Sequence, residues 1–380
     1  MKHWRGILAL TVGMGLGSGL ANAGDAGVTA TEIRLGTSAV LSGPLGPQTL
    51  QYGEGARLLF DSINARGGIH GRRITLTALD DAFDVARAVE NTKRLVEQDK
   101  VFLLFNSTGT AHVAAVLPYL AEKQTILFGP VTGASNLRDQ YHRMLFHVRA
   151  GYANEAAKIL SQLRQIGVTR VAAFYQDDAF GKALLAEVRR SSEAEKLPLV
   201  AEIPLDPAKP DFAAAAAATA KASPQAVIIG SAGTTFTQYV AAVQATSARP
   251  VFYGFSVASL DGINKALKDK ARGIVLAQIM PSLRNNTIPV VGEYLQALKA
   301  KDPAATPSAS QFEGFVHARL LVEGLRRAGR DLSTESFIRT MESAGEIAFG
   351  RFTARYTPQS HNGSSYVELA IIDSDGNLRY

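Results

Sequence analysis

The sequence predicts an α/β protein built from two doubly wound lobes. Short apolar runs alternate with helical segments in two series, roughly residues 31–147 and 150–272. Apolar runs of this length between helices are typical of buried parallel strands, and the alternation is typical of a doubly wound sheet. A helix-rich tail follows and has to pack back on the first lobe. The chain therefore crosses between the lobes more than once, which predicts a hinge with a cleft.

The first series is predicted to alternate strand and helix from its start. The pair Gly67-Gly68 ends the first helix, since glycine is favoured just beyond a helix C-terminus. Asp84 is placed to cap the second helix. The expected strands are 33–40, 73–79, 101–105 and 125–128, and the expected helices are 50–65, 84–98 and 110–122.

The second series repeats this alternation and then gives way to the tail. One helix carries a run of alanines, the residue with the highest helix propensity. The expected strands are 170–175, 200–205, 226–230, 251–255 and 273–280, with helices 152–165, 180–194, 211–221 and 234–246. The tail is expected to hold helices 289–301, 311–328 and 333–343 and terminal strands 351–356 and 366–372.

Two loops of small and hydroxyl residues form the candidate site. One follows the strand at 101–105 and the other the strand at 125–128. Ligands of such sheets bind outside the carboxyl ends of the strands. Ser107, Thr110 and Thr132 can donate hydroxyls there, and helix N-termini favour a carboxylate. The pattern indicates a pocket that grips a small anionic group without transforming it. Two ordinary helix-capping loops are the alternative interpretation.

Composition excludes several functional classes. The chain has no cysteine, so it has no disulfide, thiol nucleophile or thiolate metal site. The formal charge of +6 comes from scattered residues without a basic run, so we expect no nucleic-acid partner. The segment 254–258, GFSVA, lacks the last glycine of a hydrolase nucleophile elbow. The seven histidines do not pair at metal-ligand spacing. We expect no enzyme activity, cofactor or metal.

The N-terminus predicts export. Lys2 and Arg5 precede an apolar, glycine-rich run at 7–20, and Ala21-Asn22-Ala23 follows as a small-residue cleavage pattern. These three parts are typical of a secretory signal peptide, here residues 1–23. Export of a chain without cysteine suits a bacterial periplasm.

Motifs along nearly the whole chain after the signal peptide resemble one family. They match the periplasmic substrate-binding proteins of branched-chain amino-acid ABC importers, the leucine/isoleucine/valine-binding-protein family. The segment DSINARGGIHGR at 61–72 is the most specific. The others are IRLG at 33–36, LSGP at 41–44, GEGA at 53–56, the Asp pair at 80–81, QDDAFG at 176–181, PDF at 210–212, QFEG at 311–314 and LVEGLRRAG at 321–329.

The resemblance implies the type I periplasmic binding protein fold, with two lobes joined by a three-segment hinge. It implies an N-terminal lobe of residues 24–147 and 277–350 and a C-terminal lobe of residues 148–276 and 351–380. A small amino acid or organic carboxylate is clamped between the lobes and delivered to an inner-membrane permease, and the protein is expected to be a monomer. A receptor that reports to a signalling partner uses the same clamp and is the alternative, and an exported hydrolase is a further one.

The resemblance also implies which residues hold the ligand. Hydroxyl and loop positions after the third and fourth strands match Ser107, Thr110, Val131, Thr132 and Gly133. The first-loop position over the ligand matches Gln48, and the second lobe contributes Phe180, Ala232 and Ser256.

Two departures from the family pattern bear on the ligand. Amino-acid-binding members are similar in placing an acid where Ser256 stands and an aromatic side chain where Ala232 stands. Without that acid a buried ammonium needs another partner, such as Asp177 or Glu313. A carboxylate without an amine, such as an aromatic or short aliphatic acid, therefore competes with an amino acid as the expected ligand.

Overall fold

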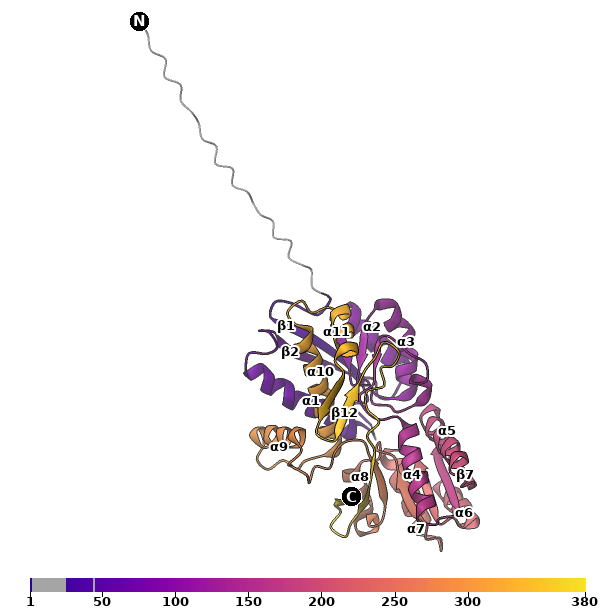
Figure 1. Cartoon of the computed structure of the whole chain (residues 1–380). Helices are drawn as coiled ribbons and strands as arrows, with labels where there is room; N and C mark the ends of the chain where they lie inside the picture. The colour runs from indigo at the N-terminus through magenta and orange to yellow at the C-terminus, as the bar shows by residue number, and fades with distance from the viewer. Residues whose placement is uncertain (2–24, 44) are drawn as a thin grey trace.

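The computed structural model describes Met1 and residues 25–43 and 45–380, so the predicted signal peptide lies, apart from Met1, outside the described residues. The predicted α/β class is confirmed, because the described chain forms two mainly parallel sheets with helices packed on them (Figure 1).

The first sheet has the order β2-β1-β3-β4-β5 and is parallel throughout. Its strands run from the chain start to the first crossing: β1 (Glu32–Ala39), β2 (Arg73–Asp80), β3 (Leu103–Phe105), β4 (Ile126–Phe128) and β5 (Leu145–Phe146). The helices that pack with it are α1 (Gly46–Ala65), α2 (Val85–Glu97), α3 (Thr110–Lys123), α9 (Pro289–Lys301), α10 (Ala309–Ala328) and α11 (Thr334–Ser343).

The second sheet has the order β14-β13-β10-β9-β8-β6-β7, in which β13 runs antiparallel to both of its neighbours and the other pairings are parallel. Its strands are β6 (Val171–Gln176), β7 (Leu199–Leu205), β8 (Ala226–Gly230), β9 (Val251–Gly254), β10 (Val275–Gln278), β13 (Glu368–Ile372) and β14 (Leu378–Arg379). Its helices are α4 (Tyr152–Gln165), α5 (Ala179–Ala194), α6 (Phe212–Ala222), α7 (Gly233–Gln244) and α8 (Leu260–Leu267). Short 3-10 turns span Ser135–Leu137 and Lys268–Ala271.

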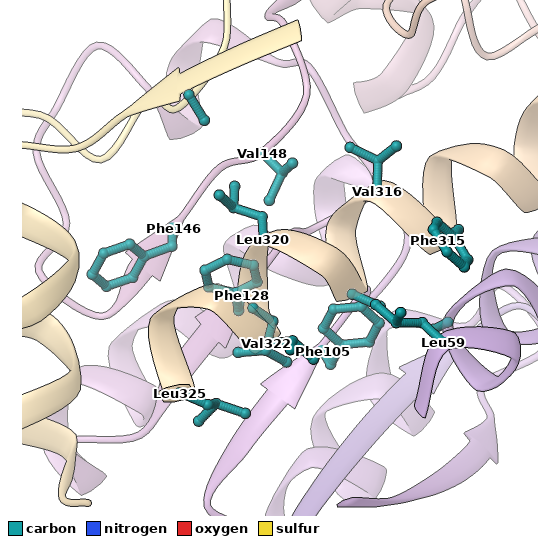
Figure 2. Packing of buried hydrophobic residues seen from close by; sticks show 14 of the residues in the cluster. Leu59, Phe105, Phe128, Phe146, Val148, Phe315, Val316, Leu320, Val322 and Leu325 are labelled. Carbon is teal, nitrogen blue, oxygen red and sulfur yellow. The ribbon is translucent and has the colours of Figure 1, made fainter. Parts of the chain in front are cut away.

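The predicted return of the tail to the first lobe is present. Helix α10 lies beside the early helix α1 in Figure 1, and α11 packs against α10. Figure 2 shows Phe315 and Leu320 of α10 packed among Phe105, Phe128 and Phe146 from three strands of the first sheet. These side chains are almost completely buried, so α10 completes the hydrophobic core of the first lobe.

The chain passes between the sheets three times, after β5, after β10 and between β12 (Phe352–Arg355) and β13. Strand β12 pairs with β11 (Glu346–Phe349) in a separate two-stranded sheet. Phe352, Ala354 and Tyr356 pack in the core that contains Phe146. The lobe boundaries remain a prediction.

Candidate functional site

A cavity of about 60 Å³ lies between the two lobes, at the carboxyl ends of their parallel strands. We refer to it as the cleft cavity. Loops from both sheets reach it, which is where open α/β sheets bind ligands. Its lining residues are Leu45, Gln48, Thr49, Tyr52, Phe83, Thr108, Gly109, Thr110, Val131, Tyr152, Phe180, Ala232 and Val257.

Three helices present N-termini without a side-chain cap to this cavity. Their N-cap residues, Leu45 of α1, Gly109 of α3 and Ala232 of α7, all line the cavity. Other helices have a side-chain cap, as Asp84 provides for α2 and Asp178 for α5, although α4 and α9 also lack one. The first-turn N–H groups of a helix have no partner within the helix. In α1 the Gly46 N–H donates to the Gly43 carbonyl oxygen and Pro47 has no N–H. The first-turn donors of α3 and α7 are therefore the ones available to an anionic ligand at the cleft cavity.

Hydroxyl groups lie next to the N-terminus of α3. Thr110 Oγ1 and Thr132 Oγ1 are 2.9 Å apart, and Thr132 Oγ1 also accepts a hydrogen bond from the Ala134 N–H. The two loops are tied together by a hydrogen bond of 2.9 Å from the Val131 N–H to the Ser107 carbonyl oxygen. Because both loops follow neighbouring strands, the pairing of β3 with β4 places these hydroxyls side by side.

The opposite wall is aromatic. Tyr152, at the start of α4, packs edge-on against Phe180 with ring centroids 6.2 Å apart. The Tyr152 N–H donates to the Gly133 carbonyl oxygen at 2.7 Å, so the first crossing is joined to the loop after β4. Burial raises the pKa of Tyr152, which keeps its phenol neutral. Phe83 adds a further apolar face from the end of β2.

One hydrogen bond joins the lobes across the edge of the cleft cavity. Gln48 Nε2 of α1 donates to the Val257 carbonyl oxygen, in the loop after β9, at 3.1 Å. Both residues line the cavity. This bond forms only while the two lobes are close together, so it belongs to a closed arrangement.

The described residues that line the cleft cavity include no acid, lysine, arginine or histidine. A buried charge that lacks a partner is costly. An anion receives hydroxyl and N–H donors at this place, whereas an ammonium group finds no carboxylate in the lining.

The nine predicted site residues are distributed unevenly. Five of them line the cleft cavity: Gln48, Thr110, Val131, Phe180 and Ala232. Thr132 lies behind Thr110, and Gly133 lies under Tyr152, where a Cβ would be 2.5 Å from the ring. Ser107 is buried outside the lining, and its Oγ has no hydrogen-bond partner among the described residues.

Ser256 lies outside the cleft cavity, in a buried ionic cluster at the first crossing. Its N–H and Oγ both donate to the carboxylate of Glu155, at 2.7 and 3.0 Å. Arg149 Nη2 donates to Ser256 Oγ at 2.5 Å. Arg149 Nε in turn lies 3.6 Å from an oxygen of Glu313. The position where the family pattern expects an acid is therefore occupied by a serine that already binds Glu155.

Burial controls the ionisation of this cluster. It raises the pKa of Glu155 to about 7, while Arg149 and the Ser256 donors pull it downward. Burial also raises the pKa of Glu313, against the same arginine. Arg149 remains charged, because the two carboxylates beside it more than offset its desolvation. These groups form a charged core at the hinge.

The sequence reasoning missed several residues that line the cavity. Tyr52, Phe83, Tyr152 and Val257 were not singled out. The position of Tyr152, directly after the crossing and at the start of a predicted helix, is a signal that could have identified it. Tyr52 offered no such signal, because it lies inside a predicted helix.

Two further searches of the described residues are negative. None of their helices is long and apolar enough to cross a membrane. Within the same residues no group of three or more histidines, cysteines or acids is arranged to hold a metal ion.

Comparisons with known proteins agree with the resemblance predicted from the motifs. A family model described as periplasmic binding protein matches residues 32–377. The Leu/Ile/Val-binding protein homolog 3 of Brucella melitensis is 23% identical and covers 94% of this chain and 96% of its own. An extracellular ligand-binding receptor of Verminephrobacter eiseniae has a TM-score of 0.85 at 27% identity and covers 92% of this chain and 100% of its own. A substrate-binding periplasmic protein of Ralstonia solanacearum has a TM-score of 0.84 at 31% identity and covers 91% and 99%.

Proposed function

The chain belongs to the periplasmic binding protein family, and from this premise we propose that it is the solute receptor of an ABC importer. We infer that it clamps a small carboxylate without an α-amine in the cleft cavity and delivers it to an inner-membrane permease. Members of this family bind solutes and are not enzymes, so the site needs to hold its ligand and not to transform it.

The uncapped helix N-termini carry this proposal. Gly109 of α3 belongs to the first lobe and Ala232 of α7 to the second, and both line the cleft cavity. A carboxylate between them receives N–H donors from both lobes, and each helix N-terminus favours a negative charge. The hydroxyls of Thr110 and Thr132 can add further hydrogen bonds from one side.

The absence of an ammonium partner supports a ligand without an amine. The described residues lining the cleft cavity include no carboxylate, and the donors of Ser256 are already bound to Glu155. An ammonium group buried there would have no carboxylate partner. Burial of an unpaired charge costs roughly several kcal/mol of binding free energy. Phe83, Tyr152 and Phe180 suit an apolar ligand body instead.

Lobe movement explains how a ligand enters so small a space. A volume of about 60 Å³ is far below that of an open ligand pocket. Separation of the lobes breaks the Gln48–Val257 hydrogen bond and opens the cavity to solvent. A ligand that contacts both lobes binds the closed state better and therefore shifts the population toward it.

Calorimetric titration of the mature protein tests the ligand class. The panel contains straight-chain and aryl-substituted monocarboxylates, their uncharged amides and the α-amino acids of the same carbon skeletons. We expect binding by at least one carboxylate and much weaker binding by its amide and its amino acid. Equal or tighter binding of the amino acids, weakened by Thr110→Val and so located in the cleft cavity, would contradict the proposed ligand class.

A matched pair of variants tests whether the carboxylate binds in the cleft cavity. Thr110→Val removes one hydroxyl at nearly constant shape and should weaken carboxylate binding by about 1–3 kcal/mol, because a buried ligand oxygen loses its donor. Thr237→Val is the control, since Thr237 is also buried but its hydroxyl bonds to the Thr234 carbonyl within α7. Equal losses in the two variants would place the ligand elsewhere.

A further inference from the structure

A second and larger cavity lies on the hinge side of the molecule. Its volume is about 290 Å³. We refer to it as the hinge cavity. Its walls come from the loop after β9 (256 and 258–261), the second crossing (278–284), the segment 306–313 around the start of α10, and the C-terminal residues 377, 378 and 380. Both lobes and a crossing segment therefore contribute to it, and the cleft cavity does not share its lining residues.

Glu313 is the buried acid in the wall of this cavity. Glu313 is 4% exposed, and its buried Oε1 receives no hydrogen bond from the described residues. Its Oε1 lies 3.6 Å from Arg149 Nε and 3.5 Å from His317 Nε2, beyond good hydrogen-bonding distance. Buried carboxylates are normally hydrogen-bonded, so this one lacks a donor that a ligand could supply.

The neighbouring charges leave Glu313 short of a counter-ion. Arg149 is shared with Glu155 through the Ser256 bridge, so one guanidinium faces two carboxylates. His317 provides no charge, because burial and Arg149 lower its pKa to about 3. Arg138 contributes a more distant positive charge, but its Nη2 donates to the backbone carbonyls of residues 132 and 149 and not to an acid.

The rest of the hinge cavity is mainly apolar, with hydroxyls between. Ile279, Met280 and Phe312 are buried parts of the wall, and Ser308 and Ser310 lie at the start of α10. At the rim the exposed side chains include one acid, Asp261, and one base, Arg284, whose charges oppose each other. The charge of a bound ligand is therefore selected at the buried end of the hinge cavity, where Glu313 lies.

We propose that the hinge cavity binds a small organic cation through its primary ammonium group, with Glu313 as the receiving carboxylate. An ammonium carries three N–H donors and one positive charge. Glu313 Oε1 receives no hydrogen bond from the described residues, and the one guanidinium beside it, Arg149, is shared with Glu155. Its alkyl portion would lie against Ile279, Met280 and Phe312. A metal ion fits less well, since one carboxylate among apolar side chains is a poor ligand set. The proposal does not depend on which ligand fills the cleft cavity.

Three compounds of one shape test the charge preference. n-Butylammonium, n-butanol and butyrate are titrated calorimetrically into the mature protein. We expect n-butylammonium to bind and n-butanol to bind far more weakly, because only the cation pairs with Glu313. Failure of n-butylammonium to bind at millimolar concentration would overturn the proposal, whatever butyrate does.

Two variants locate the binding. Glu313→Gln should weaken n-butylammonium binding by roughly tenfold or more, as expected for losing a charge-assisted hydrogen bond. Asp177→Asn is the matched control, because Asp177 is an exposed acid that pairs with Lys182 on the second lobe. Unchanged affinity in Glu313→Gln, or an equal loss in Asp177→Asn, would overturn the assignment.

A variant that fills the hinge cavity provides a second test, which is needed if Glu313→Gln folds poorly. Leu260→Trp adds bulk to a half-buried wall of the hinge cavity and leaves the ionic cluster intact. It should abolish n-butylammonium binding while the carboxylate of the cleft cavity still binds, which reports a folded protein. Retained n-butylammonium binding in this variant would overturn the proposal. Failure of Thr110→Val to affect carboxylates would count against the proposed function alone.

Discussion

Glu155 is the residue through which pH is expected to act on stability. Its side chain is completely buried, and it accepts two hydrogen bonds from Ser256. Burial raises its pKa from 4.5 to about 7. The folded protein therefore holds the proton more tightly than the unfolded chain does. The stabilisation that this provides is fully present below pH 4.5 and is lost as the pH rises through about 7.

Replacement of Glu155 by glutamine should remove this pH dependence. The shift from 4.5 to about 7 corresponds to on the order of 3 kcal/mol. Urea unfolding of the natural protein and of Glu155→Gln at a series of pH values from 4 to 8 measures it. The difference between the two unfolding free energies should move in favour of the variant as the pH rises. A difference that stays constant with pH would show that Glu155 does not titrate in this window.

Individual site residues were harder to predict from the sequence than the loops that carry them. The loops after β3 and β4 could be predicted, because parallel strands bring their carboxyl ends to one edge of the sheet. Ser256 was expected in the cleft, whereas Val257 lines the cleft cavity and Ser256 lines the hinge cavity. Neighbouring residues of an extended loop point to opposite sides, and which side faces the ligand depends on how the loop packs. The interaction of Ser256 with Glu155 spans about a hundred residues of sequence and leaves no local pattern.

At the scale of elements, α1 and α10 form the central packing contact of the first lobe. The two helices approach so closely that side chains are excluded where they cross. A Cβ on Gly55 would lie 1.8 Å from the Gln311 carbonyl oxygen, and one on Gly314 would lie 2.0 Å from the Tyr52 carbonyl oxygen. These glycines are therefore required by backbone contact and not by their own conformation.

Alanine substitutions on α1 test this contact with an internal control. Gly55→Ala should destabilise the protein by about 2–4 kcal/mol, because backbone atoms have to move apart. Gly53→Ala lies on the same helix, and its Cβ would meet only the end of the Arg57 side chain, at 3.3 Å. It should be neutral or stabilising by up to about 1 kcal/mol. Thermal unfolding measures both, and similar effects in the two variants would contradict the close crossing.

Most elements could be predicted from the alternation of apolar runs and helical segments. The tail helices were expected at 289–301, 311–328 and 333–343, and they occur at Pro289–Lys301, Ala309–Ala328 and Thr334–Ser343. The short strands β5, β11 and β14 were not predicted. Strands of two to four residues do not carry a full period of alternation, and they exist because neighbouring strands supply hydrogen-bond partners.

At the scale of the whole molecule, the chain passes between the two sheets three times, and Arg149 lies at the first of these crossings. The proposed function requires the lobes to rotate about these crossings. In the proposed closure, α1 meets the loop after β9 through the hydrogen bond from Gln48 to Val257. The two-lobe arrangement followed from the repeated series of elements and the resemblance to a known family. The boundaries of the two lobes, including the one at 350/351, stay a prediction.

A distance measurement between the lobes tests the central claim, which is that a carboxylate draws them together. The chain has no cysteine, so cysteines introduced at Glu90 of α2 and Ala217 of α6 would carry the spin labels alone. Both positions are exposed, and the two helices lie on different lobes (Figure 1). Double electron–electron resonance measures the distance between the two labels. The carboxylate that binds best should give a shorter and narrower distance distribution than the ligand-free protein, and its amide should leave the distribution unchanged. A carboxylate that binds without altering the distribution, or an amide that alters it equally, would contradict the account.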